Sequence, residues 1–304
     1  MTKTILVAGS LHYDVVVNAE RLPYLDETLF GSKVGYVAGG KGRNQAVAAA
    51  QNGAKTFMAG RVGKDAAGDF LKTDLVAQGV DTSLLQVDPS AASGMSVAVV
   101  MPSGEYGAVV VSGSNQAFAA DHLDIPEDTA ILLLQNETTD AANIAAAEKA
   151  RAAGARVILN AAPARPLFDD LASLVDILVV NRGEAAVLAG QPVEDVKSAV
   201  AAATTLCERV RRVAITLGGD GVVHMRAGGR AEHQPAFRAN VVSAHGAGDF
   251  FIGALANQLA FGSDFEAAIH YAQAAGSIFV STEVDKRAGI RPLHIRARLG
   301  EDDR

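Results

Sequence analysis

The chain has 304 residues, of which 49% are hydrophobic and 20% charged, a composition typical of a folded globular protein and not of a disordered one. Its formal net charge is -7 and no basic stretch is dense enough to follow a phosphate backbone, so we expect no nucleic-acid partner. The longest apolar runs, such as residues 131–134 and 177–180, are too short to cross a bilayer. A single cysteine, Cys207, excludes an intramolecular disulfide, and we therefore expect a cytoplasmic protein with no membrane partner.

The first third of the chain combines one strand of a main sheet with two segments that predict a smaller sheet. Residues 5–8 are an apolar run that predicts the first main strand. Two later segments predict consecutive strands without intervening helices, at residues 15–17, 28–30, 34–37, 95–101 and 108–111. We expect these strands to form a small antiparallel sheet, a β-lid inserted in the main domain. Such a small sheet needs support from the main domain or from a second copy of itself.

From about residue 120, short aliphatic runs alternate with alanine-rich stretches of helical length. Strands are predicted at residues 131–134, 157–159, 177–180 and 213–217, and helices at 141–153 and 193–207. This alternation is typical of βαβ units, so we predict an α/β fold with a mostly parallel sheet covered by helices on both faces. The main domain would comprise residues 1–10, 38–92 and 113–304, and the β-lid residues 11–37 and 93–112.

The strongest local motif is Ser-Ala-His-Gly-Ala-Gly-Asp at residues 243–249, directly before the apolar run 250–255. Small residues at the start of a helix leave its first N–H groups accessible, and the helix dipole adds to their attraction for an anion. The motif therefore suits a phosphate. Asp249 either accepts a proton from a hydroxyl that attacks phosphorus, or only occupies a helix first turn, where acidic residues are favoured.

A second glycine-rich motif, Gly-Gly-Lys-Gly-Arg-Asn, occupies residues 39–44. Residues 35–41 match the start of the phosphate-binding pattern G-x-x-x-x-G-K, but Gly42 stands where Ser or Thr would bind magnesium. A glycine pair between the small sheet and the main domain suits a hinge instead, with Lys41 and Asn44 near substrate hydroxyls. An ordinary turn before a helix at 45–51 is the alternative.

Two further loops follow predicted strands, where open α/β sheets bind ligands. Asn181 and Glu184 have two interpretations. They place a carboxylate near a magnesium ion held by nucleotide phosphates, or they form a helix capping box. Residues 216–221, Thr-Leu-Gly-Gly-Asp-Gly, form either an ordinary loop or a turn in which a nucleotide lies close to the backbone.

Taken in chain order, these motifs resemble those of the ribokinase branch of the PfkB carbohydrate kinases over almost the whole chain. The resemblance rests on Asp14, residues 39–44, Asn160-x-x-Pro163, Asn181-x-x-Glu184, residues 216–218 and residues 246–249, and it is strongest in residues 159–166 and 174–177. It implies a doubly wound, ribokinase-like α/β domain with a β-lid that closes over a sugar and often forms a homodimer. It also implies ATP and Mg²⁺ as cofactors and a small-molecule sugar as substrate.

The resemblance further implies roles for individual residues. Asp249 would be the catalytic base, and the amides of Gly246, Ala247 and Gly248 would form the anion hole. Glu184 would bind Mg²⁺, through water. The sugar would be held by Asp14, Gly40, Lys41, Asn44 and Glu137, and the nucleotide and its phosphates by Asn181, Glu184, Thr216, Leu217, Gly218, Gly219 and Gly221.

Three departures from the family pattern matter for function. Ser243 stands where the family usually has an aspartate that binds an activating potassium ion, which puts a monovalent-cation site in doubt. The segment 283–289 is more charged than its small-residue counterpart, and we hypothesise that Lys286 or Arg287 takes over the electrostatic role of the ion. His12 replaces an asparagine of the sugar pocket, so the substrate is not necessarily ribose.

The leading interpretation is an ATP-dependent kinase that phosphorylates a primary hydroxyl of ribose or a related sugar. A nucleoside, hexose or sugar-acid kinase of the same fold is the first alternative. A non-catalytic sugar or nucleotide sensor is the second, and the loss of the carboxylate at Ser243 favours it slightly.

Overall fold

The computed structural model describes residues 3–103 and 105–300, and its largest feature is a nine-stranded sheet. Residues 1–2, 104 and 301–304, which belong to the predicted main domain and β-lid, lie outside the described residues. The strand order is β13-β12-β11-β10-β9-β8-β1-β4-β5, parallel from β5 to β11 and antiparallel at β12 and β13. The strands are β1 (Thr4–Ala8), β4 (Lys55–Gly63), β5 (Leu85–Asp88), β8 (Thr129–Gln135), β9 (Arg156–Asn160), β10 (Ile177–Asn181), β11 (Arg212–Thr216), β12 (Val222–Arg226) and β13 (Glu232–Gln234).

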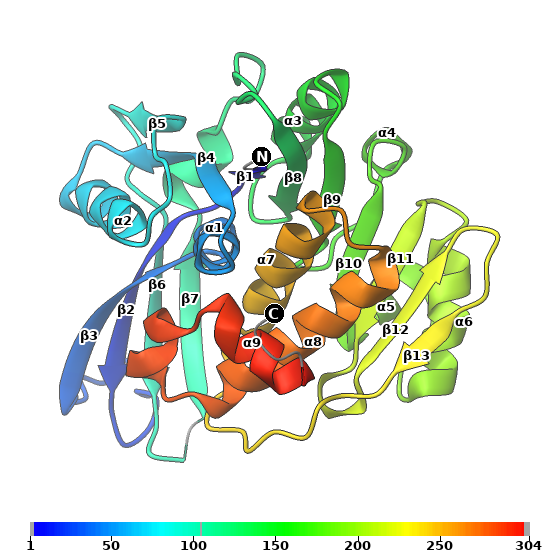
Figure 1. The fold of residues 1–304 in the computed structure, drawn as a ribbon. Coiled ribbons are helices and arrows are strands. Elements are labelled where there is room, and N and C mark those ends of the chain that lie inside the picture. Colours follow the sequence, from blue (N-terminus) through cyan, green and yellow to red (C-terminus); the bar gives the residue numbers. More distant parts are fainter. Residues whose placement is uncertain (1–2, 104, 301–304) are drawn as a thin grey trace.

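Helices cover both faces of this sheet and enclose two separate hydrophobic cores (Figure 1). The central strands β1 and β8 are buried on both faces, as their uninterrupted apolar runs predict. One core is lined by α1 (Lys41–Gln51), α2 (Ala66–Ala77), α7 (Ala247–Ala260), α8 (Phe265–Ser281) and α9 (Pro292–Leu299), and the other by α3 (Asp140–Ala152), α4 (Asp169–Ala172), α5 (Arg182–Ala189) and α6 (Val196–Leu206). The predicted doubly wound α/β fold is confirmed.

A second sheet of four strands lies beside the main one, in the order β3-β2-β6-β7 (Figure 1). We call it the lid sheet; its strands are β2 (His12–Asn18), β3 (Lys33–Gly39), β6 (Met95–Val100) and β7 (Tyr106–Val111). The β2–β6 pair is parallel, so the predicted fully antiparallel sheet was wrong in this detail. The predicted strand at residues 28–30 was also wrong: that segment has no strand pairing, and Phe30 is 93% exposed.

The chain enters the lid sheet directly from the carboxyl end of β1 and returns through β3 into α1. The end of the lid sheet and the carboxyl ends of the main strands therefore meet, which is where open α/β sheets bind ligands. Among the described residues, no helix is long and apolar enough to cross a membrane.

Candidate active site

Asp249 lies in the first turn of α7, and the helix is preceded by a glycine in a backbone conformation that few other residues adopt. Gly246, the residue before the helix, has a φ of 80°, a left-handed conformation that most side chains disfavour. The first amides of a helix have no intrahelical acceptor, so the start of α7 can bind an anion. The Ala247 N–H, however, donates to the carbonyl of Ala244 at 3.1 Å and does not point freely outward as the sequence predicts.

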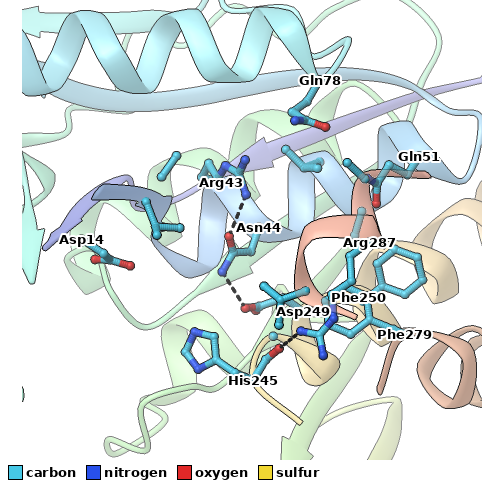
Figure 2. A pocket seen from close by; sticks show the side chains of 18 residues that line it. Asp14, Arg43, Asn44, Gln51, Gln78, His245, Asp249, Phe250, Phe279 and Arg287 are labelled. Carbon is cyan, nitrogen blue, oxygen red and sulfur yellow. Dashed lines mark hydrogen bonds between the residues drawn. The ribbon is translucent and has the colours of Figure 1, made fainter. Parts of the chain in front are cut away.

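The carboxylate of Asp249 is held by two amide side chains of α1. Asn44 Nδ2 donates to Oδ2 at 3.2 Å (Figure 2), and Gln45 Nε2 donates to Oδ1 at 3.0 Å. Gln45 is fully buried; its Nε2 also donates to Asn160 Oδ1 at 3.1 Å, and its Oε1 accepts from Gln135 Nε2 at 2.8 Å. The chain of amides fixes the orientation of Gln45, and Gln45 in turn fixes the carboxylate.

Burial raises the pKa of Asp249, whereas Lys41 and the hydrogen bonds from Gln45 and Asn44 act in the opposite direction. A carboxylate with a raised pKa is a stronger base than a solvated aspartate, which suits the removal of a hydroxyl proton. The local electrostatics therefore favour proton transfer at this position.

A polar cavity of about 560 Å³ separates the lid sheet from the main domain above Asp249. The lid sheet contributes side chains from β2, β6 and β7, and the main domain contributes the starts of α1, α5 and α7. The cavity brings together all the residues predicted to bind the sugar with several of those predicted for catalysis and for the nucleotide: His12, Asp14, Gly40, Lys41, Asn44 and Glu137, together with Asn181, Glu184, Thr216, Gly246, Gly248 and Asp249.

Glu137 is fixed in this cavity through one of its two carboxylate oxygens. Its Oε2 accepts hydrogen bonds from Ser10 Oγ at 2.5 Å and from the Lys41 N–H at 2.9 Å. The same oxygen lies 4.0 Å from Nδ1 of His12, a buried residue whose Nε2 has no hydrogen-bond partner among the described residues. These contacts leave Oε1 of Glu137 to interact with a ligand, whereas Nε2 of His12 is buried without a hydrogen-bond partner among the described residues.

Asp14 is held on the lid side of the cavity. Ser96 Oγ, on the neighbouring strand β6, donates to Asp14 Oδ1 at 2.5 Å. Burial raises the pKa of Asp14, while the Ser96 hydrogen bond lowers it. A carboxylate from the lid thus faces the main-domain residues across the cavity.

A second, largely apolar cavity of about 300 Å³ lies on the other side of the start of α7. It is lined by the predicted loop residues Thr216, Gly218, Gly219 and Gly221, and also by Ala236, Phe237, Val241, Ala247, Gly248 and residues of α8. Leu217 was predicted with this group, but it is buried in a hydrophobic core and does not line the cavity, because the turn at 217–221 directs it inward.

Arg182 supports this loop, a role that no sequence motif indicated. Its Nη2 donates to Asp220 Oδ2 at 2.7 Å and to the carbonyl of Leu217 at 3.3 Å. The guanidinium therefore ties the start of α5 to the 217–221 turn.

Asn181 and Glu184 form a complete capping box at the start of α5, the structural alternative that their spacing allowed. Asn181 Oδ1 accepts from the Glu184 N–H at 2.9 Å, and Glu184 Oε2 accepts from the Asn181 N–H at 2.8 Å. Both residues also line the polar cavity, and burial raises the pKa of Glu184. Within residues 3–103 and 105–300, no cluster of three or more His, Cys, Asp or Glu side chains could hold a metal ion.

A third cavity, of about 240 Å³, lies beside Asp249 between α1 and residues 284–288 (Figure 2). Arg43, Gln51, Phe279 and Arg287 contribute to its walls. Asp249 therefore lines both this cavity and the polar cavity under the lid sheet.

Comparison with known proteins agrees with this arrangement. Residues 2–286 match the pfkB family carbohydrate kinases. The chain belongs to this family. As a carbohydrate kinase it is a phosphotransferase with an alcohol acceptor.

Ribokinases are among the similar members of the pfkB family. The ribokinase of Haemophilus influenzae is 35% identical over 92% of this chain and 93% of the relative. That of Bacillus subtilis is 35% identical over 91% of this chain and 93% of the relative. The structure of Arabidopsis thaliana ribokinase with ribose and ATP superposes with a TM-score of 0.91, at 29% identity, over 98% of this chain and 99% of that one.

Proposed function

We propose that this carbohydrate kinase transfers the γ-phosphoryl group of ATP to a primary hydroxyl of ribose or a closely related sugar, with Mg²⁺. The observation that carries the proposal is the position of the first turn of α7 between a polar cavity under the lid sheet and an apolar cavity beside residues 216–221. A sugar in the first cavity and a nucleotide in the second would meet at Asp249. The similarity to ribokinases, one of them solved with ribose and ATP, supports this pair of ligands.

In the proposed reaction, Asp249 accepts the proton of the sugar hydroxyl as its oxygen attacks the γ-phosphorus and the bond to the ADP oxygen breaks. The negative charge of the transferring group is stabilised by the amides of Gly246 and Gly248 and by the dipole of α7. The Ala247 amide joins them when its hydrogen bond to Ala244 opens. Since phosphoryl transfer depends mainly on positioning and electrostatics, no covalent intermediate with the protein is required.

The sugar hydroxyls would be bound by charged and amide groups from both sides of the polar cavity. Asp14 and Glu137 accept hydrogen bonds, and Lys41 and Asn44 donate them. The backbone of Gly40 and the imidazole of His12 complete the set. A sugar that lacks one hydroxyl leaves a buried polar group unpaired, so discrimination among sugars is expected to be strong.

The residues around Glu184 fit a magnesium ion bound to nucleotide phosphates. Mg²⁺ usually keeps several waters and uses only one or two carboxylates together with phosphate oxygens. Glu184 is a partly buried carboxylate with one oxygen fixed by the capping box, and it would contact the ion through water, with Asn181 beside the phosphates. When bound, the ion neutralises charge on the phosphates.

His12 affects which sugar the protein is proposed to bind. Its imidazole is larger than an asparagine amide and offers a different donor and acceptor pattern. Deoxyribokinases of Salmonella are 32% identical over 87% of this chain and 88% of the relatives, so a deoxysugar belongs in the test together with hexoses, sugar acids and nucleosides.

We also propose that residues 11–37 and 93–112 move as a lid and that two copies pair through it, giving a homodimer. The lid sheet exposes apolar side chains, among them Val34, Tyr36, Val97, Val109 and Val111 at 41% to 68%. Exposed apolar patches of this kind often mark interfaces. Sedimentation of the protein and of a Val109→Lys variant tests the pairing, and a monomeric parent protein would refute it.

The catalytic proposal is tested by measuring ADP formation with ATP, Mg²⁺ and a panel of sugars and nucleosides. We expect ribose or a related sugar to be phosphorylated, and Asp249→Asn to lower kcat roughly 10²- to 10⁴-fold while calorimetry still detects ATP binding. Near-normal turnover of Asp249→Asn would remove this residue from the role of base. ATP binding without turnover on any acceptor would favour a sensor.

A further inference from the structure

Arg287 is a buried cation next to the loop that leads into α7. It belongs to the short helix η3 (Val284–Gly289), and only 8% of the residue is exposed. Its Nη2 donates to the carbonyl of Ser243 at 2.6 Å, Nη1 to the carbonyl of His245 at 2.9 Å (Figure 2), and Nε to the carbonyl of Thr282 at 3.2 Å. All three nitrogens are therefore bound by backbone carbonyl oxygens.

The charge of Arg287 is balanced without an acidic side chain. Within residues 3–103 and 105–300 it forms no ion pair with a carboxylate. Thr282 directly follows α8 (Phe265–Ser281), so its carbonyl lies next to the negative end of a helix dipole. The guanidinium also lies 4.2 Å from the centre of the Phe279 ring, and Phe279 stacks on Phe250 of α7. Arginine remains charged in such a place because its pKa is so high.

A ring of carbonyl oxygens around one positive charge is the kind of environment that binds a dehydrated monovalent metal ion. Here the oxygens of Ser243, His245 and Thr282 already accept hydrogen bonds from a guanidinium, and Ser243 supplies no carboxylate. This arrangement does not fit a potassium ion. The other cation suggested by the sequence, Lys286, is exposed and paired with Glu283 at 2.6 Å, so it does not reach these carbonyls.

We propose that Arg287 is a positioning residue that replaces a monovalent cation, so that phosphoryl transfer by this protein needs no potassium. The inference rests on the proposed kinase function and adds a specific property to it. The guanidinium links the end of α8 to residues 243–245, which directly precede the left-handed Gly246 and the first amides of α7. Holding these carbonyls fixes the direction of the amides that face the phosphoryl group.

The first test uses the unmodified protein and compares kcat in potassium, sodium and tetramethylammonium chloride at equal ionic strength. We expect the three kcat values to agree within about twofold, because the positive charge belongs to the Arg287 side chain and not to a dissolved ion. Several-fold activation by potassium would overturn the proposal, and this result does not depend on the folding of any variant.

The second test removes the guanidinium with Arg287→Ala, using Lys286→Ala as the matched control for loss of a neighbouring cation. We expect kcat of Arg287→Ala to fall roughly 10- to 100-fold, because displaced amides no longer meet the transferring group. The KM for the sugar should change little, and added guanidinium or potassium should restore part of the turnover. A kcat equal to that of the parent protein would contradict the proposal, as would a loss that no cation restores.

A readout independent of turnover separates this inference from the proposed function. Amide hydrogen exchange of residues 243–249 should be faster in Arg287→Ala than in the parent and slower again when guanidinium is added. If the parent phosphorylates no sugar in any salt, the kinase proposal fails, while the exchange result still decides whether Arg287 orders this loop. Unchanged exchange in the variant would refute that ordering.

Discussion

Gln45 offers the sharpest test of how the site is assembled, because it touches no proposed ligand directly. It is fully buried and joins three polar side chains, donating to Asp249 and Asn160 and accepting from Gln135. Gln45→Leu keeps a similar volume but removes all three hydrogen bonds. The buried Gln135 amide and Asn160 carbonyl then lose a partner, at about 1–3 kcal/mol each, so the free energy of unfolding should fall by about 2–6 kcal/mol.

The same substitution should change the pH dependence of activity. A hydrogen bond to a carboxylate is worth about 1.5 kcal/mol or more, which corresponds to roughly one pH unit in the pKa of Asp249. Because the Gln45 hydrogen bond lowers this pKa, its loss raises it. The proposed base accepts a proton only when ionised, so the acidic limb of kcat/KM should move to higher pH by about one unit. At neutral pH, kcat should fall about tenfold because the carboxylate is no longer oriented.

The assay is a pH series of initial rates with saturating ATP, together with denaturant unfolding. Gln51→Leu is the matched control, since Gln51 lies on the same helix and beside the cavity next to Asp249. It should leave the acidic limb in place. A Gln45→Leu protein with the parent's acidic limb and turnover would refute the idea that the amide chain tunes Asp249.

Two further predictions concern stability and nucleotide binding. The pKa of Asp249 is raised in the folded protein, so its contribution favours folding at acidic pH and is lost as pH rises through the folded pKa; the stability of Asp249→Asn relative to the parent should therefore increase as pH rises from acidic to neutral values, and a pH-independent difference in thermal unfolding would contradict this. Arg182→Ala should raise the KM for ATP about three- to tenfold and leave the KM for the sugar unchanged, because the guanidinium supports the 217–221 turn, at the modest strength of a partly exposed ion pair, and otherwise donates to the carbonyl of Glu194, which does not line the polar cavity. Arg226→Ala, which breaks a similar ion pair with Glu266, is the control for the Arg182 variant. Equal effects of the two substitutions on the KM for ATP would argue against a specific role of Arg182 in supporting the turn.

The fold was predictable because hydrophobic periodicity and strand alternation report on burial directly. The runs at residues 131–134 and 177–180 are central strands, as their uninterrupted apolar character indicated. The exposed segment 28–30 has strand-forming residues but no neighbouring strand to pair with, and no local pattern contains that information. Long-range pairing, such as the parallel contact of β2 with β6, was missed for the same reason.

The arrangement of the candidate site was partly predictable because motifs identify the residues proposed to contact ligands, whereas the residues that support them carry no motif. Asp249 directly precedes the apolar run of a predicted helix, and Glu137 follows a predicted strand. Gln45, Gln135 and Arg182 act through other side chains, and each becomes visible only when three distant segments are brought together. The identity of the buried cation was open between two neighbouring residues, and only the direction of the side chains distinguishes Arg287 from Lys286.

One close helix contact connects the fold to the chemistry. A Cβ on Gly253 of α7 would lie 2.5 Å from the Cβ of Ala48 on α1. Gly253 and Ala48 each lie four residues, about one helical turn, beyond Asp249 and Asn44 on the same helix faces. The absence of a side chain at Gly253 thus lets the two helices approach closely enough for the Asn44 and Gln45 amides to reach the carboxylate.

Gly253→Ala should therefore lower activity without touching the site. The added methyl must push the helices apart by about 1 Å to reach an ordinary carbon contact, and a displacement of this size between reacting groups can cost about 100-fold in rate. Overpacking should also destabilise the protein by about 1–3 kcal/mol, more than the gain of under about 1 kcal/mol that alanine brings to a helix. Gly276→Ala in α8 is the control, because a Cβ there meets nothing within 4 Å. Thermal unfolding of this variant measures the stability that alanine adds to a helix without overpacking. A Gly253→Ala protein that is as active as the parent and more stable would show that the helix spacing does not set the geometry of Asp249.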